Sequence, residues 1–119
     1  MNTETTNQKI SFEEFKKVEI KVGRILSAER IIDTDKLLKL MVDFSEGEPR
    51  QIVSGIAEYF MDPQELVGVK CLFVTNLEPR TIRGYESNGM LFAMGGKGDI
   101  PFSLISPVNM DVPEGTVGN

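Results

Sequence analysis

The sequence predicts an all-β fold, a five-stranded barrel, on the basis of three observations. Apolar and polar side chains alternate in two separate stretches, which is the period of half-buried strands. A nearly continuous apolar run follows later, as in a strand that is buried on both faces. Between these strands and that run lies one short segment with helix-capping residues at both ends. The 119 residues show no internal repeat and no second domain.

The chain is expected to begin with a disordered segment, residues 1–10, followed by a short helix. Ser11 is a typical N-cap residue, and Glu14 stands three positions later, which is the capping-box pattern. Phe12 and Phe15 are three residues apart and would share the apolar face of this helix.

The first strand of the barrel is expected from Val18 to about Glu29. Apolar residues alternate with charged ones from Val18 onward, but at Gly23 the parity slips, so that Ile25 is the next apolar residue. A glycine with a phase shift predicts a bulge or a sharp bend at that position.

Four further strands complete the predicted barrel. Leucine, leucine, valine and phenylalanine alternate with polar or less apolar residues over 38–44, which predicts the second strand. A turn with glycine and proline at 45–49 leads into the third strand, 51–55. The apolar run at 70–76 is the fourth strand, and 89–94 is the fifth.

A short helix is expected between the third and fourth strands. Asp62 is its N-cap, Pro63 takes the first helical position, Glu65 is the capping-box partner and Gly68 marks the end. Three strands, a helix and two strands in that order are the topology of the OB-fold, a five-stranded Greek-key barrel. In that fold the ligand lies against strands two and three and the neighbouring loops.

The remaining segments are expected to be loops and an extension. Residues 77–88 are predicted to form a loop, and a glycine-rich turn follows the fifth strand. The barrel domain would thus occupy residues 11–98. Residues 99–119 contain apolar side chains that are hard to bury on one small barrel, so this extension is predicted to form a dimer interface. Those side chains are Phe102, Leu104, Ile105, Val108 and Met110.

The composition argues against several classes of chemistry. The chain has no histidine, the commonest general base and metal ligand. The single cysteine, Cys71, can form neither an internal disulfide nor a zinc site, and its apolar neighbours predict a buried structural thiol. The carboxylates are scattered and form no convincing acid–base pair. We therefore expect a non-catalytic protein without a cofactor or metal.

The sequence also indicates where the protein works. No apolar run approaches the roughly 20 residues that span a bilayer, and the polar N-terminus lacks the apolar region of a signal peptide. Together with the single cysteine, these features favour a cytoplasmic protein with no membrane partner.

The charge is negative overall but unevenly distributed. A net charge of −5 argues against indiscriminate binding to nucleic acid. Residues 16–39 carry seven basic and four acidic side chains, and residues 70–98 carry four basic and two acidic ones. The intervening residues 40–69 carry one basic and six acidic side chains. The two basic segments could converge in the fold, although an ordinary solvated surface has the same composition.

Three stretches carry more specific motifs than the strand pattern. They are residues 15–23 taken together with 35–40, residues 50–56, and residues 76–90. The last reads Asn-Leu-Glu-Pro-Arg-Thr-Ile-Arg-Gly-Tyr-Glu-Ser-Asn-Gly-Met. Together these motifs resemble the tRNA-binding domain family, which occurs at the C-terminus of many bacterial methionyl-tRNA synthetases and as free-standing structure-specific tRNA-binding proteins. The resemblance covers nearly the whole chain.

The resemblance implies an OB barrel with a C-terminal extension that helps to form a homodimer. It implies that the protein grips the outside of the tRNA L-shape rather than reading an anticodon, and so raises the effective tRNA concentration for a synthetase. tRNA is then the expected partner, and methionyl-tRNA synthetase is the enzyme it assists or belongs to.

Four basic side chains are candidates for the tRNA contact. Arg80 and Arg83, stiffened by the preceding proline, could clamp phosphate oxygens, or each could pair with a neighbouring glutamate. Lys39 points away from the core side of the second strand, and Lys36 can approach the same region. As isolated lysines they would be solvated surface charges, and the family pattern supports a binding role.

Five other residues in or near the motifs have alternative interpretations. Asn76 either ties down the loop that follows it or contacts a base or ribose. Ser87 could donate to a phosphate or a 2′-hydroxyl, and Met90 is either core or ligand contact. Gly84 is expected to supply a turn conformation. Arg24, at the predicted bend, is a weaker candidate.

Two other functions stay open from the sequence. A secretion-related bacterial chaperone shares this fold and dimer and binds unfolded peptides, and the negative charge and six methionines favour that role. The protein could also be a scaffold whose role is dimerisation. The signature at 76–90 favours tRNA. Because tryptophan is absent and most phenylalanines occupy core-like positions, recognition of backbone and shape is expected rather than stacking on single strands.

Overall fold

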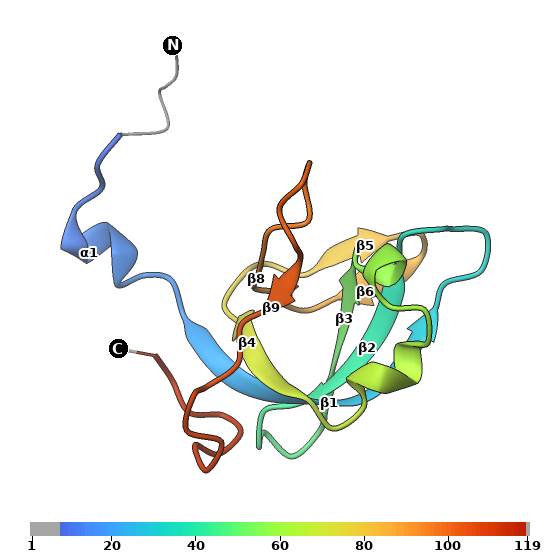
Figure 1. Cartoon of the computed structure of the whole chain (residues 1–119). Helices are drawn as coiled ribbons and strands as arrows, with labels where there is room; N and C mark the ends of the chain where they lie inside the picture. The colour runs from blue at the N-terminus through green and yellow to red at the C-terminus, as the bar shows by residue number, and fades with distance from the viewer. Residues whose placement is uncertain (1–7, 119) are drawn as a thin grey trace.

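The computed structural model describes residues 8–118, which form nine β-strands, one short α-helix and two 3₁₀ helices (Figure 1). Most of the expected disordered segment, residues 1–7, lies outside the described residues. Residues 8–10 have no regular secondary structure.

Five strands form the predicted barrel, and every neighbouring pair is antiparallel. In spatial order β3-β2-β1-β4-β7, their bounds are Arg50–Ser54, Leu38–Asp43, Ile20–Arg30, Lys70–Val74 and Met90–Leu91. The two ends of this sheet meet and nearly close it. Asn88 N donates to the carbonyl of Gln51 at 2.8 Å, and Arg50 Nη1 donates to the carbonyl of Thr75 at 2.7 Å. The all-β barrel predicted from the sequence is confirmed.

Strand β1 is long because it pairs with two neighbours in turn. Its first residues, up to Arg24, pair with β4, and from Arg24 onward it pairs with β2. The ladder with β2 slips between Ile25 and Ser27, which is a bulge that coils the strand. The bulge predicted at Gly23 is therefore wrong in position, because Gly23 pairs regularly with Cys71.

Gly23 is required by close packing instead. A Cβ atom at this position would lie 2.6 Å from Phe44 Cε1 and Val42 Cγ1, and 2.9 Å from Phe73 Cδ1. These distances are far below van der Waals contact, so only glycine fits. The parity slip in the sequence thus marks a core-facing position with no room for a side chain.

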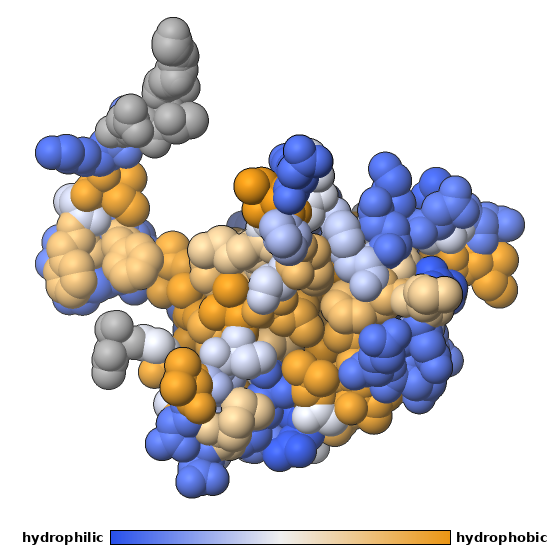
Figure 2. Space-filling view, viewed as in Figure 1, coloured by the Kyte–Doolittle hydropathy of each residue, from blue (hydrophilic) through white to orange (hydrophobic). Residues whose placement is uncertain are grey.

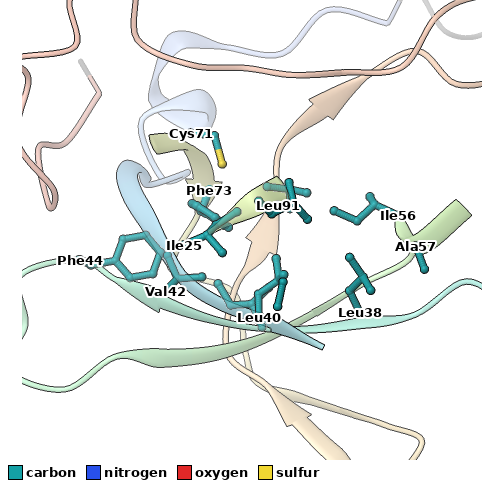
Figure 3. Close-up of a cluster of buried hydrophobic side chains, with 13 residues drawn as sticks. Ile25, Leu38, Leu40, Val42, Phe44, Ile56, Ala57, Cys71, Phe73 and Leu91 are labelled. Carbon is teal, nitrogen blue, oxygen red and sulfur yellow. The ribbon is translucent and has the colours of Figure 1, made fainter. Parts of the chain in front are cut away.

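The core fills the barrel interior, where side chains from all parts of the sheet meet (Figure 3). Strand β2 shows the predicted alternation, and its Leu38, Leu40 and Val42 are fully buried. The rings of Phe44 and Phe73 pack edge-on with their centroids 5.3 Å apart. Truncation of a fully buried leucine such as Leu40 to alanine costs about 2–5 kcal/mol.

The helix expected between β3 and β4 is present as two 3₁₀ turns, η2 (Ala57–Tyr59) and η3 (Pro63–Leu66). The predicted caps of η3 are confirmed: Asp62 Oδ1 accepts from Gln64 N at 3.0 Å, and Glu65 Oε2 accepts from Asp62 N at 3.3 Å. Four residues between proline and the end signal are too few for a stable α-helix, so the segment takes the tighter form.

Helix α1 (Phe12–Phe15) has the predicted capping box, with Ser11 Oγ accepting from Glu14 N at 3.1 Å. Figure 1 shows it set apart from the barrel, on the same side as the C-terminal end. Its two phenylalanine rings are 69% and 49% exposed. Figure 2 shows apolar surface over this helix, next to the barrel.

The segment predicted to be a loop at 77–88 contains a β-hairpin, so that prediction is wrong. Strand β5 (Arg80–Ile82) pairs with β6 (Tyr85–Ser87). Arg83 and Gly84 form the two-residue turn with φ of 53° and 86°, as a type I′ turn requires. Gly84 supplies a turn conformation as expected.

The predicted fifth strand is broken into two short strands. Its first part is β7, which pairs with β4 in the barrel. Its second part, β8 (Ala93–Met94), turns away to pair with β9 (Ser103–Leu104), which lies in the C-terminal extension. The glycine-rich turn joins β8 to β9.

The end of the C-terminal extension lies along β1 of the same chain. Val22 N donates to the carbonyl of Thr116 at 3.0 Å, and Gly118 N donates to the carbonyl of Ile20 at 2.7 Å. The buried Lys70 ammonium holds the carbonyls of Met110 and Val112 at 2.7 and 2.8 Å. Part of the predicted extension therefore completes the edge of the barrel.

Candidate functional site

Two basic segments meet at one end of the barrel. Loop 31–37 connects β1 to β2, and the hairpin β5–β6 follows β4; Figure 1 shows both on the side away from α1. Lys36 and Arg83 line the same surface hollow, with Asp33, Thr34, Asp35 and Leu37. Each of the two basic segments thus contributes one basic side chain to this hollow, beside the two aspartates.

Loop 31–37 is held by its own hydrogen bonds. Thr34 Oγ1 donates to the carbonyl of Ile31 at 3.0 Å and accepts from Leu37 N at 3.3 Å. Asp33 takes a φ of 68°, a left-handed conformation that aspartate tolerates. These contacts leave Lys36 exposed at the rim of the hollow.

The hairpin is fixed against the edge of β3. Ser87 Oγ accepts from Val53 N at 2.9 Å and donates to the carbonyl of Gly89 at 3.3 Å. Gln51 Nε2 donates to the carbonyl of Glu86 at 2.9 Å. The hairpin therefore presents its turn from a defined position.

Arg80 and Arg83 are both exposed on this hairpin. Within residues 8–118 neither forms an ion pair, so the pairing with a neighbouring glutamate that the sequence left open is not seen. Arg80 shares a shallow hollow with Met90, whose side chain is 46% exposed.

Lys39 lies on the outer face of β2, as predicted, beside two other side chains. Its Nζ is 3.1 Å from Glu29 Oε1, on the neighbouring strand, and 5.5 Å from the centre of the Tyr85 ring. Tyr85 was not among the residues singled out from the sequence, because only the hairpin brings it next to Lys39.

Two predicted site residues are engaged inside the chain. Asn76 Nδ2 donates to the carbonyl of Lys17 at 2.6 Å, and its Oδ1 accepts from Glu19 N at 2.8 Å. The amide therefore holds the segment before β1, not the loop after β4 that the sequence suggested. Ser87 is 5% exposed, and its hydroxyl oxygen accepts the hydrogen bond from Val53 N.

Four of the nine other basic side chains in the described residues form ion pairs. Lys16, Lys21, Arg24 and Arg50 each pair with a glutamate. The weaker candidate Arg24 pairs with Glu114 of the C-terminal extension. Hydrogen bonds from the Glu114 backbone and from Arg24 lower the pKa of that carboxyl. Lys36, Arg80 and Arg83 form no ion pair within residues 8–118, although Asp33 and Asp35 line the same hollow as Lys36 and Arg83.

The single cysteine lies in the barrel core, away from the hairpin and loop 31–37. Burial raises the pKa of the Cys71 thiol to about 12, so it stays protonated at neutral pH and is a poor nucleophile. Among residues 8–118, no three acidic or cysteine side chains gather where they could hold a metal ion. No helix in this range is long and apolar enough to span a membrane.

Comparison with known proteins gives consistent matches. A family model described as "Putative tRNA binding domain" matches residues 20–116. A methionine–tRNA ligase of Methanocorpusculum labreanum is 49% identical over 107 residues, which are 90% of this chain and 15% of that protein. The chain spans about a seventh of the length of the curated relatives it matches.

Two solved structures share the fold over nearly the whole chain. A MetRS related protein from Pyrococcus horikoshii is 43% identical with a TM-score of 0.83, and the match covers 93% of this chain and 98% of that one. The chaperone CsaA from Bacillus anthracis is 25% identical with a TM-score of 0.79, covering 94% and 100%.

Proposed function

Because the chain belongs to the tRNA-binding domain family, we propose that it is a non-catalytic module that recognises the shape and phosphate backbone of tRNA. The observation that supports this best is the meeting of Lys36 and Arg83 at one hollow, from two separately braced segments. We place the protein in the cytoplasm, where tRNA is charged and used.

The hairpin and the loop offer two kinds of phosphate contact. The planar guanidinium groups of Arg80 and Arg83 can each donate two parallel hydrogen bonds to phosphate oxygens. Lys36 adds a point charge from the second segment. Contacts to the backbone position a protein on nucleic acid without reading bases, so the module would bind many tRNAs through their common shape.

The relatives suggest which enzyme gains from this binding. We propose that the module serves methionyl-tRNA synthetase, either as part of that chain or as a separate assistant. Linking a binding module to a catalytic domain raises the local concentration of the substrate without any new chemistry.

The first test is a titration of labelled bulk tRNA with the Arg80→Ala/Arg83→Ala variant at several salt concentrations. The wild-type protein should bind more weakly as salt rises, because bound phosphates release counterions. The double variant should bind more weakly at low salt and should have a salt slope that is smaller by about two.

Lys16→Ala/Lys17→Ala is the matched control, because it removes the same charge beside α1, away from the hairpin. It should retain most of the affinity. Equal losses in the two variants would show that only net charge matters, and the proposed site would be wrong. Absence of tRNA binding by the wild type at low salt would refute the proposed function.

We also propose that the module is a homodimer, joined through α1 and the C-terminal extension. Phe12, Phe15 and Val18 line one apolar hollow with Gly118, so the two ends of the described chain lie together. Val108 and Met110 of the extension are 103% and 52% exposed. A second copy that covered these side chains would remove apolar surface from water.

Peptide binding, as in the chaperone, is the second candidate function. The likeness to CsaA and the exposed apolar side chains of the extension support it. The higher identity to the MetRS related protein favours tRNA. Binding of an unfolded peptide, measured beside the tRNA titration, distinguishes the two functions. A chaperone should still bind the peptide in the Arg80→Ala/Arg83→Ala variant.

A further inference from the structure

The binding face contains one aromatic side chain amid the basic ones. Tyr85 begins strand β6, directly after the turn that carries Arg83. The centre of its ring lies 5.5 Å from Lys39 Nζ. In the ladder of the hairpin, Tyr85 is the partner of Ile82. The ring is half-buried, so part of it faces solvent between Lys39 and the hairpin turn.

The two tyrosines of this chain have different surroundings. Tyr59 stacks on Phe102 with ring centroids 4.2 Å apart, and its hydroxyl donates to the carbonyl of Gly96 at 3.0 Å. Tyr85 stacks on no other ring among residues 8–118, and its hydroxyl makes no hydrogen bond there. The packing of the fold thus accounts for Tyr59, whereas the Tyr85 ring faces the Lys39 ammonium and has no aromatic partner among residues 8–118.

We propose that Tyr85 stacks against an unpaired nucleobase of the bound RNA, while Lys39 exchanges Glu29 for a neighbouring phosphate. This proposal rests on the proposed function and extends it from the phosphate backbone to the bases. It makes the site prefer RNA with exposed bases over a fully paired helix.

The physical basis is the geometry around Lys39. Its ion pair with Glu29 is partly exposed, with exposed fractions of 27% and 64% for the two side chains, so exchange for a phosphate costs little. The Lys39 ammonium group already lies close to the Tyr85 ring. One nucleotide could therefore place its base on the ring and its phosphate beside the ammonium. Stacking of a base on an aromatic ring tolerates any base identity, which suits a module that binds many tRNAs.

Affinity measurements test the preference for unpaired bases. Tyr85→Leu should weaken binding of bulk tRNA by about 5- to 100-fold, and Tyr85→Phe, which retains the ring, should bind almost as the wild type does. Binding of a fully paired RNA duplex of similar length should be unchanged by either substitution. Wild-type affinity in Tyr85→Leu, or equal losses for tRNA and duplex, would overturn the proposal.

The absence of tryptophan allows a direct optical test. In Tyr59→Phe, Tyr85 is the only tyrosine, and stacking on a base should quench its fluorescence when tRNA is added. In Tyr85→Phe, Tyr59 is the only tyrosine, and its emission should fall only by the absorbance of the added tRNA. Equal decreases in the two variants would refute stacking. If the wild type binds no tRNA, the proposed function fails, whereas unchanged Tyr85 fluorescence with tRNA bound refutes only this inference.

Discussion

At the scale of single residues, the sequence indicates which side chains are unusual but not which atoms they meet. Ser87 has the chemistry to contact a phosphate, yet its hydroxyl bonds to Val53 N on another strand. Asn76 likewise serves the backbone before β1. Both partners are distant in the sequence, so no local pattern could reveal them. Arg83, which needs no internal partner, was easier to identify as a candidate.

Gly23 gives a stability prediction at this scale. Gly23→Ala should lower the free energy of unfolding by about 1–3 kcal/mol, because its Cβ would lie 2.6 Å from Phe44 and Val42 in the closed core. Urea denaturation followed by circular dichroism would measure the change.

Gly55→Ala is the matched control for that substitution. A Cβ at Gly55 meets nothing within 4 Å, and its φ is not left-handed. Its free energy of unfolding should stay the same or rise by about 0.4–1 kcal/mol. If the two variants were equally stable, the core around position 23 would have to be looser than described.

At the scale of elements, long periodic segments were predictable and short ones were not. The alternation over 38–44 predicted β2 with nearly correct bounds, because each inward position must be apolar. The hairpin β5–β6 was missed because its strands have three residues each and its turn is Arg-Gly rather than Asn-Gly. Contacts with β3, not local preference, hold this hairpin together.

The C-terminal extension gives a prediction about one element. Lys70→Met removes the ammonium that holds Met110 and Val112, so the segment that follows should detach from β1 more often. Hydrogen exchange should speed up at the amides of Val22 and Gly118, which donate across this contact.

Exchange in the remainder of the barrel should change little in that variant, because methionine can fill the buried space of the lysine stem. Lys97→Met, at an exposed turn, is the control and should leave all these amides unchanged. Unaltered exchange in Lys70→Met would mean that the backbone bonds alone hold the extension.

At the scale of the whole molecule, the two proposed binding surfaces lie on opposite sides. Lys36, Arg80 and Arg83 lie with the hairpin and loop 31–37, whereas the aromatic side chains of α1 lie beside the C-terminal end (Figure 1). The sequence indicated both sets, but only the fold separates them in space. The proposed RNA contact and the proposed dimer contact therefore do not compete for the same surface.

Dimerisation is testable from this division. Sedimentation at micromolar concentration should give twice the 13.3 kDa mass of one chain. Phe12→Ser/Phe15→Ser should shift the protein toward the monomer, because these rings lie in the apolar surface that a second copy would cover. Ile32→Ser removes a side chain that is 84% exposed in loop 31–37 and should leave the mass unchanged. A wild-type mass of one chain would refute the dimer, and the exposed rings of α1 would then need a different partner.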